Sequence, residues 1–152
     1  MKLKLALCIP VLLFFTPVGL YAAHCSATAT SMSFGEYDVF STNPTDSRGS
    51  ITVRCNGPEK HEVFFTISMT TGNSGTYSPR KMTRVGDAIE YNIFTNPAGT
   101  EVWGDGTDRS ATVSGTGWKD APRQFYFYGR IPGGQDVAAG SYTDSVTVSV
   151  EW

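Results

Sequence analysis

The sequence has few of the residues from which metal sites and most active sites are built. It contains two histidines, His24 and His61, and three cysteines, with no Cys-x-x-Cys or His-x-x-x-His spacing. Zinc sites normally use such spacings, so we expect no metal site. P-loop, GxGxxG and HExxH motifs are absent too, and neither histidine accompanies a nucleophile in a recognisable motif. We therefore expect a protein that is not an enzyme and has no cofactor.

Charge of one sign is not concentrated anywhere in the chain. Twelve basic and fourteen acidic residues are scattered over 152 residues. A nucleic-acid partner is not expected, because such surfaces gather basic residues on one face. No helical period extends beyond one turn either. Apolar residues instead recur at every second position between clusters of Gly, Pro, Asn, Asp and Ser, which is typical of an all-β protein.

The one long apolar run lies near the N-terminus. Two lysines precede the run Leu5–Phe15, and a proline, a glycine and a pair of alanines follow it. This pattern is typical of a secretory signal peptide, with cleavage after Ala22 or Ala23. An uncleaved anchor is the weaker alternative, because the run has about half of the roughly 20 residues that a membrane-spanning helix needs. We expect a signal peptide at 1–23 and one domain at 24–152, which is exported and is not membrane-embedded when mature.

Signal cleavage removes Cys8 and leaves Cys25 and Cys55. Two cysteines in an exported protein normally pair, and two buried free thiols are the alternative. A bridge that closes about 30 residues contributes roughly 3.5 kcal/mol in the chain-entropy model. An immunoglobulin domain carries a tryptophan between two distant cysteines, and no tryptophan lies between these two. The disulfide is therefore expected to join early strands.

Alternation with a period of two predicts six strands and a small ribbon, and their spacing suits a β-sandwich. The expected strands are Ala27–Phe34, Ser50–Cys55, Glu62–Met69, Ala88–Thr95, Arg123–Ile131 and Tyr142–Glu151, with the ribbon around Glu101–Val113. The last strand carries an apolar face that consists of Tyr142, Val146, Val148, Val150 and Trp152. Such a strand must bury this face and pair its edge, so the function depends on what lies beside it.

Five motifs in this order resemble the spore coat protein U or Csu-type pilin family. They are Phe34-Gly-Glu-Tyr37, Gly49-Ser-Ile-Thr-Val-Arg-Cys55, Glu90-Tyr-Asn-Ile-Phe94, Val102-Trp-Gly-Asp-Gly-Thr107, and Tyr128-Gly-Arg-Ile-Pro-Gly-Gly-Gln135 leading to Gly140-Ser-Tyr-Thr-Asp144. The resemblance implies an incomplete immunoglobulin-like β-sandwich whose last strand is missing. It also implies delivery by a periplasmic chaperone to an outer-membrane usher. Another pilin subunit would then add its strand to a groove lined by the C-terminal apolar face, in a surface fimbria or a secreted coat.

One departure from this family changes the expected role. Shaft subunits are expected to carry ten or more alternating residues before the first cysteine, about 33 Å of donor strand. Cleavage after Ala22 or Ala23 leaves at most two residues before Cys25. We therefore expect a subunit that accepts a strand without donating one, at a distal or chain-initiating position or in a coat. The alternative is cleavage at or before Thr16, which retains part of the apolar segment as a donor.

A secreted carbohydrate-binding module is the alternative class of function. Trp103, Trp118, Tyr126 or Tyr77 would then serve as stacking surfaces for sugars. The C-terminal strand favours assembly instead, because from Val146 to Trp152 its apolar alternation has no charged guard but Glu151. The segment Asp105-Gly-Thr-Asp108 is interpreted as a turn, because it lacks the further acidic ligands of a calcium loop.

Overall fold

The computed structural model describes residues 23–56 and 62–152, so the expected signal peptide lies outside the described residues except for Ala23. The described residues form eight strands and one short 3-10 helix, and none of their helices is long and apolar enough to cross a membrane. The elements are β1 (His24–Ala29), β2 (Thr45–Asn56), β3 (Val63–Met69), η1 (Gly72–Ser74), β4 (Arg80–Arg84), β5 (Asp87–Phe94), β6 (Val113–Gly117), β7 (Arg123–Ile131) and β8 (Val148–Glu151).

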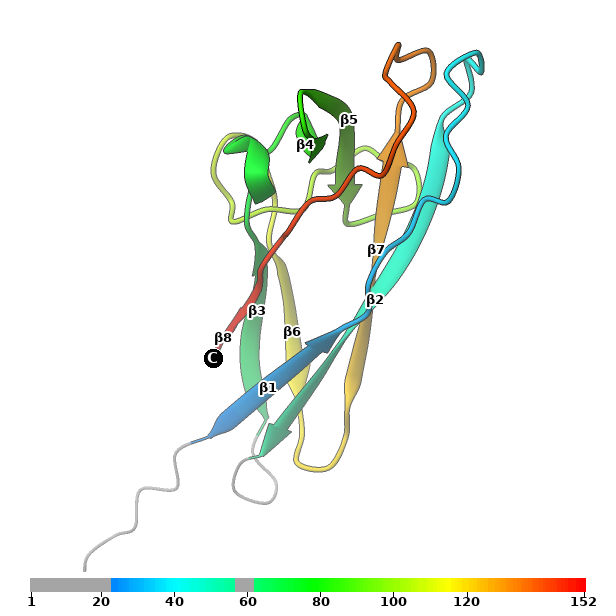
Figure 1. Cartoon of the computed structure of the whole chain (residues 1–152). Coiled ribbons are helices and arrows are strands. Elements are labelled where there is room, and N and C mark those ends of the chain that lie inside the picture. The colour runs from blue at the N-terminus through cyan, green and yellow to red at the C-terminus, as the bar shows by residue number, and fades with distance from the viewer. Residues whose placement is uncertain (1–22, 57–61) are drawn as a thin grey trace, which may run out of the picture.

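The strands form two antiparallel sheets that enclose one core (Figure 1). The larger sheet has the order β1-β2-β7-β5-β4, and the smaller sheet has the order β6-β3-β8. Strands that neighbour each other in space are mostly distant in sequence, as β2 and β7 are. The prediction of an all-β sandwich is confirmed.

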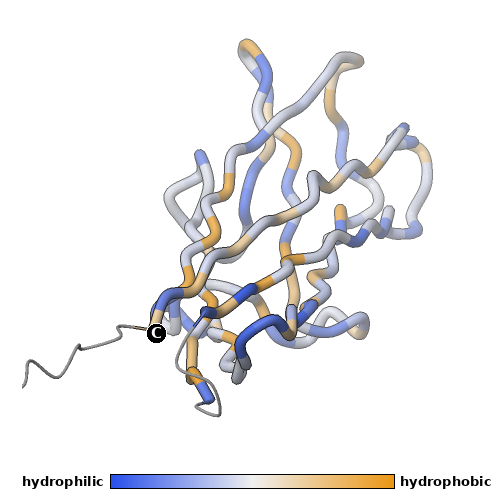
Figure 2. Tube along the Cα trace, turned by 90° about the horizontal axis from the view of Figure 1, so that it is seen from below, coloured by the Kyte–Doolittle hydropathy of each residue, from blue (hydrophilic) through white to orange (hydrophobic). Residues whose placement is uncertain are grey.

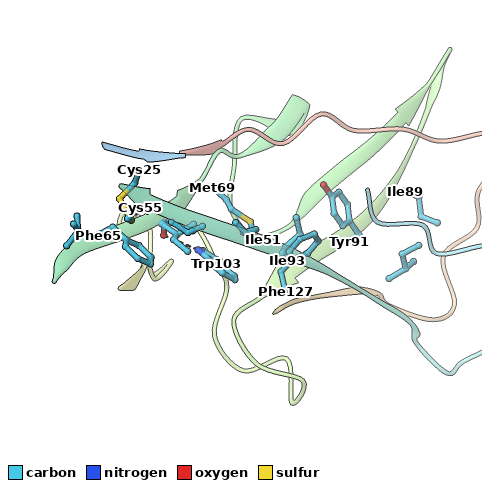
Figure 3. Close-up of a cluster of buried hydrophobic side chains, with 14 residues drawn as sticks. Cys25, Ile51, Cys55, Phe65, Met69, Ile89, Tyr91, Ile93, Trp103 and Phe127 are labelled. Carbon is cyan, nitrogen blue, oxygen red and sulfur yellow. Dashed lines mark hydrogen bonds between the residues drawn. A yellow bond between two sulfur atoms is a disulfide. The ribbon is translucent and has the colours of Figure 1, made fainter. Parts of the chain in front are cut away.

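The core is built from the inward positions of alternating strands. In β2 and β3, every second residue is buried, from Ile51 to Cys55 and from Val63 to Met69. Figure 2 shows hydrophilic and hydrophobic residues interleaved along the extended segments of the chain. Figure 3 shows the side chains of both sheets meeting around Trp103 and Ile51. Burial of about 25 cal/mol per Å² of apolar surface makes this core the main source of stability.

The predicted disulfide joins the first two strands. Cys25 and Cys55 are partners in the register of β1 and β2, and their sulfur atoms are 2.07 Å apart. The disulfide prediction is therefore confirmed. The first strand begins three residues earlier than its alternation indicated and ends at Ala29, because its pairing follows the register of β2 rather than its own weak pattern.

Two strands were not predicted from the sequence. The strand β4 carries three basic residues in five, and β6 has the sequence Val-Ser-Gly-Thr-Gly with no apolar alternation. Both exist because a neighbouring strand offers its edge, β5 to β4 and β3 to β6. A side chain at Gly117 would clash with Cys55, since its Cβ would lie 2.8 Å from Sγ. The glycines of β6 thus allow close approach to the core.

Candidate functional site

Each sheet ends in a strand that has one partner among the described strands. The strand β8 pairs only with β3, from Thr66↔Glu151 to Met69↔Val148, and β1 pairs only with β2. The two edge strands meet near the disulfide. There the indole Nε1 of Trp152 donates to the Ala23 carbonyl at 2.9 Å, and the His24 ring meets the Trp152 ring edge-on at 5.5 Å. The seam between the sheets is therefore closed at this end.

Beyond this end, the two edges separate and leave a groove of about 400 Å³. One wall is the segment 29–34, which follows β1, and the other is the segment 142–148, which leads into β8. The floor consists of apolar side chains from the core, namely Met69, Met82, Tyr91, Ile93 and Phe127. A second hollow of about 800 Å³ continues between the segments 32–40 and 137–142. The two hollows share Met32, Phe34, Met82 and Tyr142, so we describe them as one acceptor groove.

The residues of the apolar face predicted for the C-terminal strand lie in two places. Some line the acceptor groove, and the others lie beside the core and at the closed seam between the sheets. Tyr142, Val146 and Val148 line the acceptor groove and are half-buried. Val150 packs against the core next to β3, and Trp152 lies at the closed seam with 53% of its surface exposed. The regular part of the predicted strand Tyr142–Glu151 is only β8, because the residues before Val148 lie beside the groove without a continuous ladder.

All three methionines of the described residues lie in the groove. Met32 comes from one wall, and Met69 and Met82 come from the floor. The thioether side chain is unbranched and polarisable, so it adapts to differently shaped apolar partners. The sequence analysis did not single out these residues, because isolated methionines carry no periodic signal. Met32 packs over β7, where a Cβ at Gly129 would lie 2.4 Å from its sulfur.

Hydrogen bonds to the Asp87 side chain hold the segment 137–148, which includes the wall 142–148, in place. The Asp87 carboxylate accepts from the Tyr142 hydroxyl at 2.6 Å and from the Ala138 N–H at 2.8 Å. The Tyr142 hydrogen bond, with smaller contributions from backbone N–H groups, holds the pKa of Asp87 below its usual range. Arg84 donates to the Ala139 carbonyl and lies over the Tyr142 ring, 5.8 Å from its centroid.

A second carboxylate, Asp144, fixes the middle of the same wall. It accepts from the Tyr91 hydroxyl at 2.7 Å and from the Asn73 N–H at 2.7 Å. Burial, together with this hydrogen bond, raises the pKa of the Tyr91 phenol, so the hydroxyl remains a donor. Thr143 also exchanges two main-chain hydrogen bonds with Thr83 of β4. One edge of the wall is thus fastened to the fold, and the other edge faces the groove.

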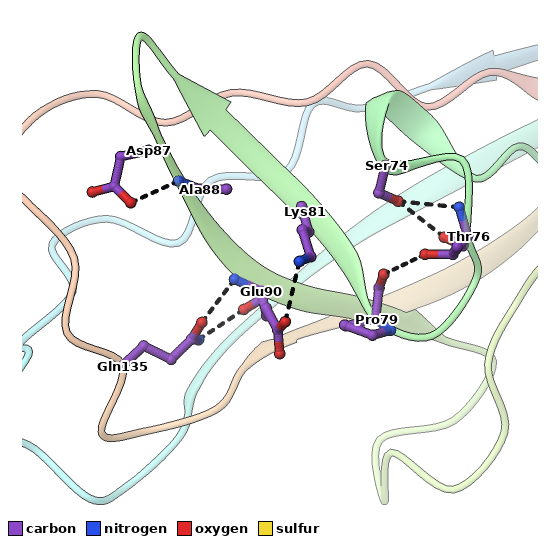
Figure 4. A network of polar contacts seen from close by, with 8 residues as sticks. All are labelled: Ser74, Thr76, Pro79, Lys81, Asp87, Ala88, Glu90 and Gln135. Carbon is purple, nitrogen blue, oxygen red and sulfur yellow. Dashed lines mark hydrogen bonds and ion pairs between the residues drawn. The ribbon is translucent and has the colours of Figure 1, made fainter.

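A glutamine side chain continues the pairing of β5 beyond the last residue of β7. Its Oε1 atom accepts from the Glu90 N–H at 2.8 Å, and its Nε2 atom donates to the Glu90 carbonyl at 2.9 Å. Figure 4 shows Gln135 in this position, with the Lys81–Glu90 ion pair across β4 and β5. The Gln135 N–H donates to the Tyr37 hydroxyl, which itself donates to the Pro132 carbonyl. Both groove walls are therefore anchored to the larger sheet by side chains.

Two of the four residues expected as sugar-stacking surfaces are buried, and that part of the prediction is wrong. Trp103 is 1% exposed and donates its indole N–H to the Ile67 carbonyl at 3.1 Å. Tyr77 is also buried, and its hydroxyl donates to the Met69 carbonyl. Trp103 belongs to the apolar core, and the Tyr77 ring lies against the Arg80 guanidinium, 5.2 Å from its centroid. Only Trp118 and Tyr126, each exposed by more than two-fifths, present a ring to solvent.

The fold and groove define a class, a β-sandwich in which two sheet edges beside an apolar cleft lack a second partner among the described strands. The Spore Coat Protein U domain family matches residues 15–149, and the chain belongs to this family. The predicted family is therefore confirmed. A search of curated proteins found no match.

Solved structures include a similar fold. One is described as the crystal structure of the CsuC–CsuE chaperone–tip adhesion subunit pre-assembly complex from archaic chaperone-usher Csu pili of Acinetobacter baumannii. It is 24% identical to this chain, with a TM-score of 0.59. The match covers 86% of this chain and 40% of that chain, so the present sequence spans two-fifths of its length. At this identity the likeness concerns the fold alone.

Proposed function

We propose that the chain is a non-enzymatic structural subunit of a surface pilus or fimbria assembled by the chaperone–usher route. The acceptor groove would receive an extended apolar strand from another protein chain. The observation that carries this proposal is the wall 142–148, whose apolar side chains are half-buried and whose free edge faces an apolar cleft. Strand addition uses both features, because main-chain hydrogen bonds give affinity and pockets select alternate side chains.

The dimensions of the groove suit a strand. The wall 142–148 has seven residues, which corresponds to about 23 Å of extended chain at 3.3 Å per residue. An inserted strand would cover Tyr142, Val146 and Val148 and would pair with the edges that the two sheets leave free. Val150 and Trp152 would instead support the closed end of the groove.

The partners that fit this role are proteins met in sequence during export. A periplasmic chaperone would occupy the groove first, an outer-membrane usher would receive the complex, and another pilin subunit would replace the chaperone. The membership of the Spore Coat Protein U family and the fold shared with a chaperone-bound tip subunit support this order. The mature protein would then lie at the cell surface, or in a secreted coat.

A strand-accepting position without donation remains a prediction, because residues 1–22 lie outside the described residues. N-terminal sequencing of the exported protein tests it. A mature start at or before Thr16 contradicts this prediction without affecting the groove itself.

Titration of the exported protein with a synthetic strand tests the groove. A suitable probe is a peptide of six Val-Thr repeats flanked by lysines, with binding followed by hydrogen exchange at the two walls. We expect protection of the residues 29–34 and 142–148 on binding. Val148→Asp should abolish binding, because a carboxylate would have to be buried against the floor.

Ser149→Asp is the matched control, because it adds the same charge to the next residue, whose side chain is exposed. Circular dichroism and intact disulfide mass report whether both variants fold. Equal binding by the two variants contradicts the proposal. A wild-type domain that is monomeric, highly heat-stable and indifferent to the peptide contradicts it as well.

A further inference from the structure

A separate pocket lies on the outer face of the larger sheet. Its volume is about 320 Å³, and its lining includes Asp46 and Arg48 of β2 with Tyr128 and Arg130 of β7. In β7 these positions alternate with Phe127 and Ile131, which face the core, so the pocket and the acceptor groove lie on opposite faces of the sheet. The volume is within the range of small-molecule sites.

The aromatic part of the pocket comes from three neighbouring strands. Tyr128 is the register partner of Arg48 on one side and of Phe94 on the other, so the three side chains form one row. Tyr128 and Phe94 are half-buried. Tyr126 lies two residues along β7 on the same face, is 46% exposed, and has the Arg48 guanidinium 5.6 Å from its ring centroid. The row extends the apolar surface beyond the pocket.

The polar part of the pocket is preorganised. Arg130 donates two hydrogen bonds to the Asp46 carboxylate, at 2.7 and 2.9 Å. This interaction lowers the pKa of Asp46 and raises the pKa of Arg130, so both groups stay charged. Gly99 closes one side with a φ of +69°, and a Cβ there would lie 2.9 Å from the Arg130 guanidinium. A side chain at this position would press on the Arg130 guanidinium, and the positive φ disfavours one.

The charges of the lining do not cancel. Asp46 neutralises Arg130, whereas Arg48 forms no ion pair with any residue of the described ranges 23–56 and 62–152. The lining thus keeps one positive charge beside ring faces and fixed hydrogen-bonding groups. A guanidinium of this kind is suited to recognising a carboxylate by paired hydrogen bonds.

We propose that this pocket binds a single acidic sugar unit, a hexuronate, within a polysaccharide. The apolar face of the sugar ring packs on Tyr128 and Phe94, and its carboxylate meets Arg48. The Asp46–Arg130 pair and Asn96 face its hydroxyl groups, and the next sugar unit reaches Tyr126. The proposal does not depend on the acceptor groove, because the groove opens on the other face of the sheet.

Isothermal titration of the exported protein with two trisaccharides tests this inference. The probes are trigalacturonate and the neutral trimer of galactose. We expect trigalacturonate to bind at least tenfold more tightly, and we expect 0.5 M NaCl to weaken its binding by screening. Arg48→Gln should weaken trigalacturonate binding at least tenfold. Tyr128→Leu should weaken both ligands while keeping an apolar side chain in the row.

The matched control is Arg54→Gln, because Arg54 is an exposed arginine of the same strand outside the pocket. An equal loss in the two arginine variants means that only general charge attraction operates and overturns the proposal. Equal affinity for the two trimers, or no heat of binding at millimolar concentrations, overturns it as well. Val148→Asp, which alters the groove, should leave trigalacturonate binding unchanged, so that failure of one site is distinguished from failure of the other.

Discussion

The strand β2 and the C-terminal segment 142–152 have the same sequence pattern and different surroundings. Both alternate apolar with polar residues, and both carry β-branched apolar residues on one face, Ile51 and Val53 in β2 and three valines in the C-terminal segment. In β2, Val53 is 1% exposed, because the strand lies between β1 and β7 and its face is covered by the smaller sheet. In the C-terminal segment, Val146 and Val148 are half-buried, because one edge and part of one face have no cover among the described residues.

The difference shows that alternation predicts which face of a strand is apolar but does not determine how far that face is buried. Burial needs a second layer, and pairing needs a neighbour on each edge. The closed half of the sandwich has both and is held by a disulfide and an apolar core. In the open half, the Asp87 and Asp144 carboxylates accept hydrogen bonds from main-chain N–H and tyrosine hydroxyl groups, and the Gln135 side chain pairs with the main chain of Glu90. We expect the two halves to respond differently to substitution.

Loss of the disulfide should give the largest effect. Cys25→Ser/Cys55→Ser removes a bridge across a sequence separation of 30, and we expect the free energy of unfolding to fall by about 3.5 kcal/mol. Urea unfolding of the exported protein measures the loss. Reduction of the wild type should reproduce it, and a loss below about 1 kcal/mol would contradict the expectation that the disulfide stabilises the closed half.

A pair of identical substitutions compares the two halves directly. Val53→Ala should cost about 2 kcal/mol, from two buried methyl groups and the cavity they leave. Val148→Ala should cost less than about 1 kcal/mol, because that side chain is only half-buried. Urea unfolding checks both values. Addition of the Val-Thr peptide should raise the stability cost of Val148→Ala toward that of Val53→Ala. An unchanged difference between the two costs at saturating peptide would contradict the proposal that the peptide fills the groove.

Oxidation should affect the open half selectively. Hydrogen peroxide converts accessible methionines to the polar sulfoxide, and Met32 and Met82 are half-buried whereas Met69 is buried. We expect the affinity for the Val-Thr peptide to fall about tenfold, or ~1.4 kcal/mol. Met32→Leu/Met82→Leu keeps the apolar volume and should bind the peptide with or without peroxide. Equal peroxide sensitivity in this variant would show that oxidation acts elsewhere.

The smallest expected effect concerns acid. The pKa of Asp87 is lowered in the folded protein, so the unfolded chain takes up the proton at a higher pH than the folded chain does. The contribution of Asp87 is therefore present above about pH 4 and is lost as the pH falls through the folded pKa. Melting temperatures at pH 7 and pH 3 should differ less for Asp87→Asn than for the wild type. Asp136→Asn, an exposed carboxylate near the same wall, should keep the wild-type difference.

Individual strands show what could be predicted and why the rest could not. Arg123–Ile131 was predicted with its observed bounds, because Phe125 and Phe127 alternate with tyrosines on the other face and neither glycine nor proline interrupts the strand before Gly129. The strand β4 was missed because three of its five residues are basic, yet Arg80 is fully buried. It donates to the carbonyls of Thr70 and Trp103 and to the Asn92 side chain, and no local pattern encodes these three partners.

The sequence by itself determined the all-β class, the disulfide and the apolar face of the C-terminal strand, because each depends on residue type and local spacing. The tertiary structure decided that Trp103 is in the core, that the methionines line one groove, and that Tyr128 and Arg48 share a pocket on the outer face. Those outcomes depend on which strands become neighbours. The register between β2, β7 and β5 brings together residues more than 30 positions apart, and it is set by the packing of the whole sandwich.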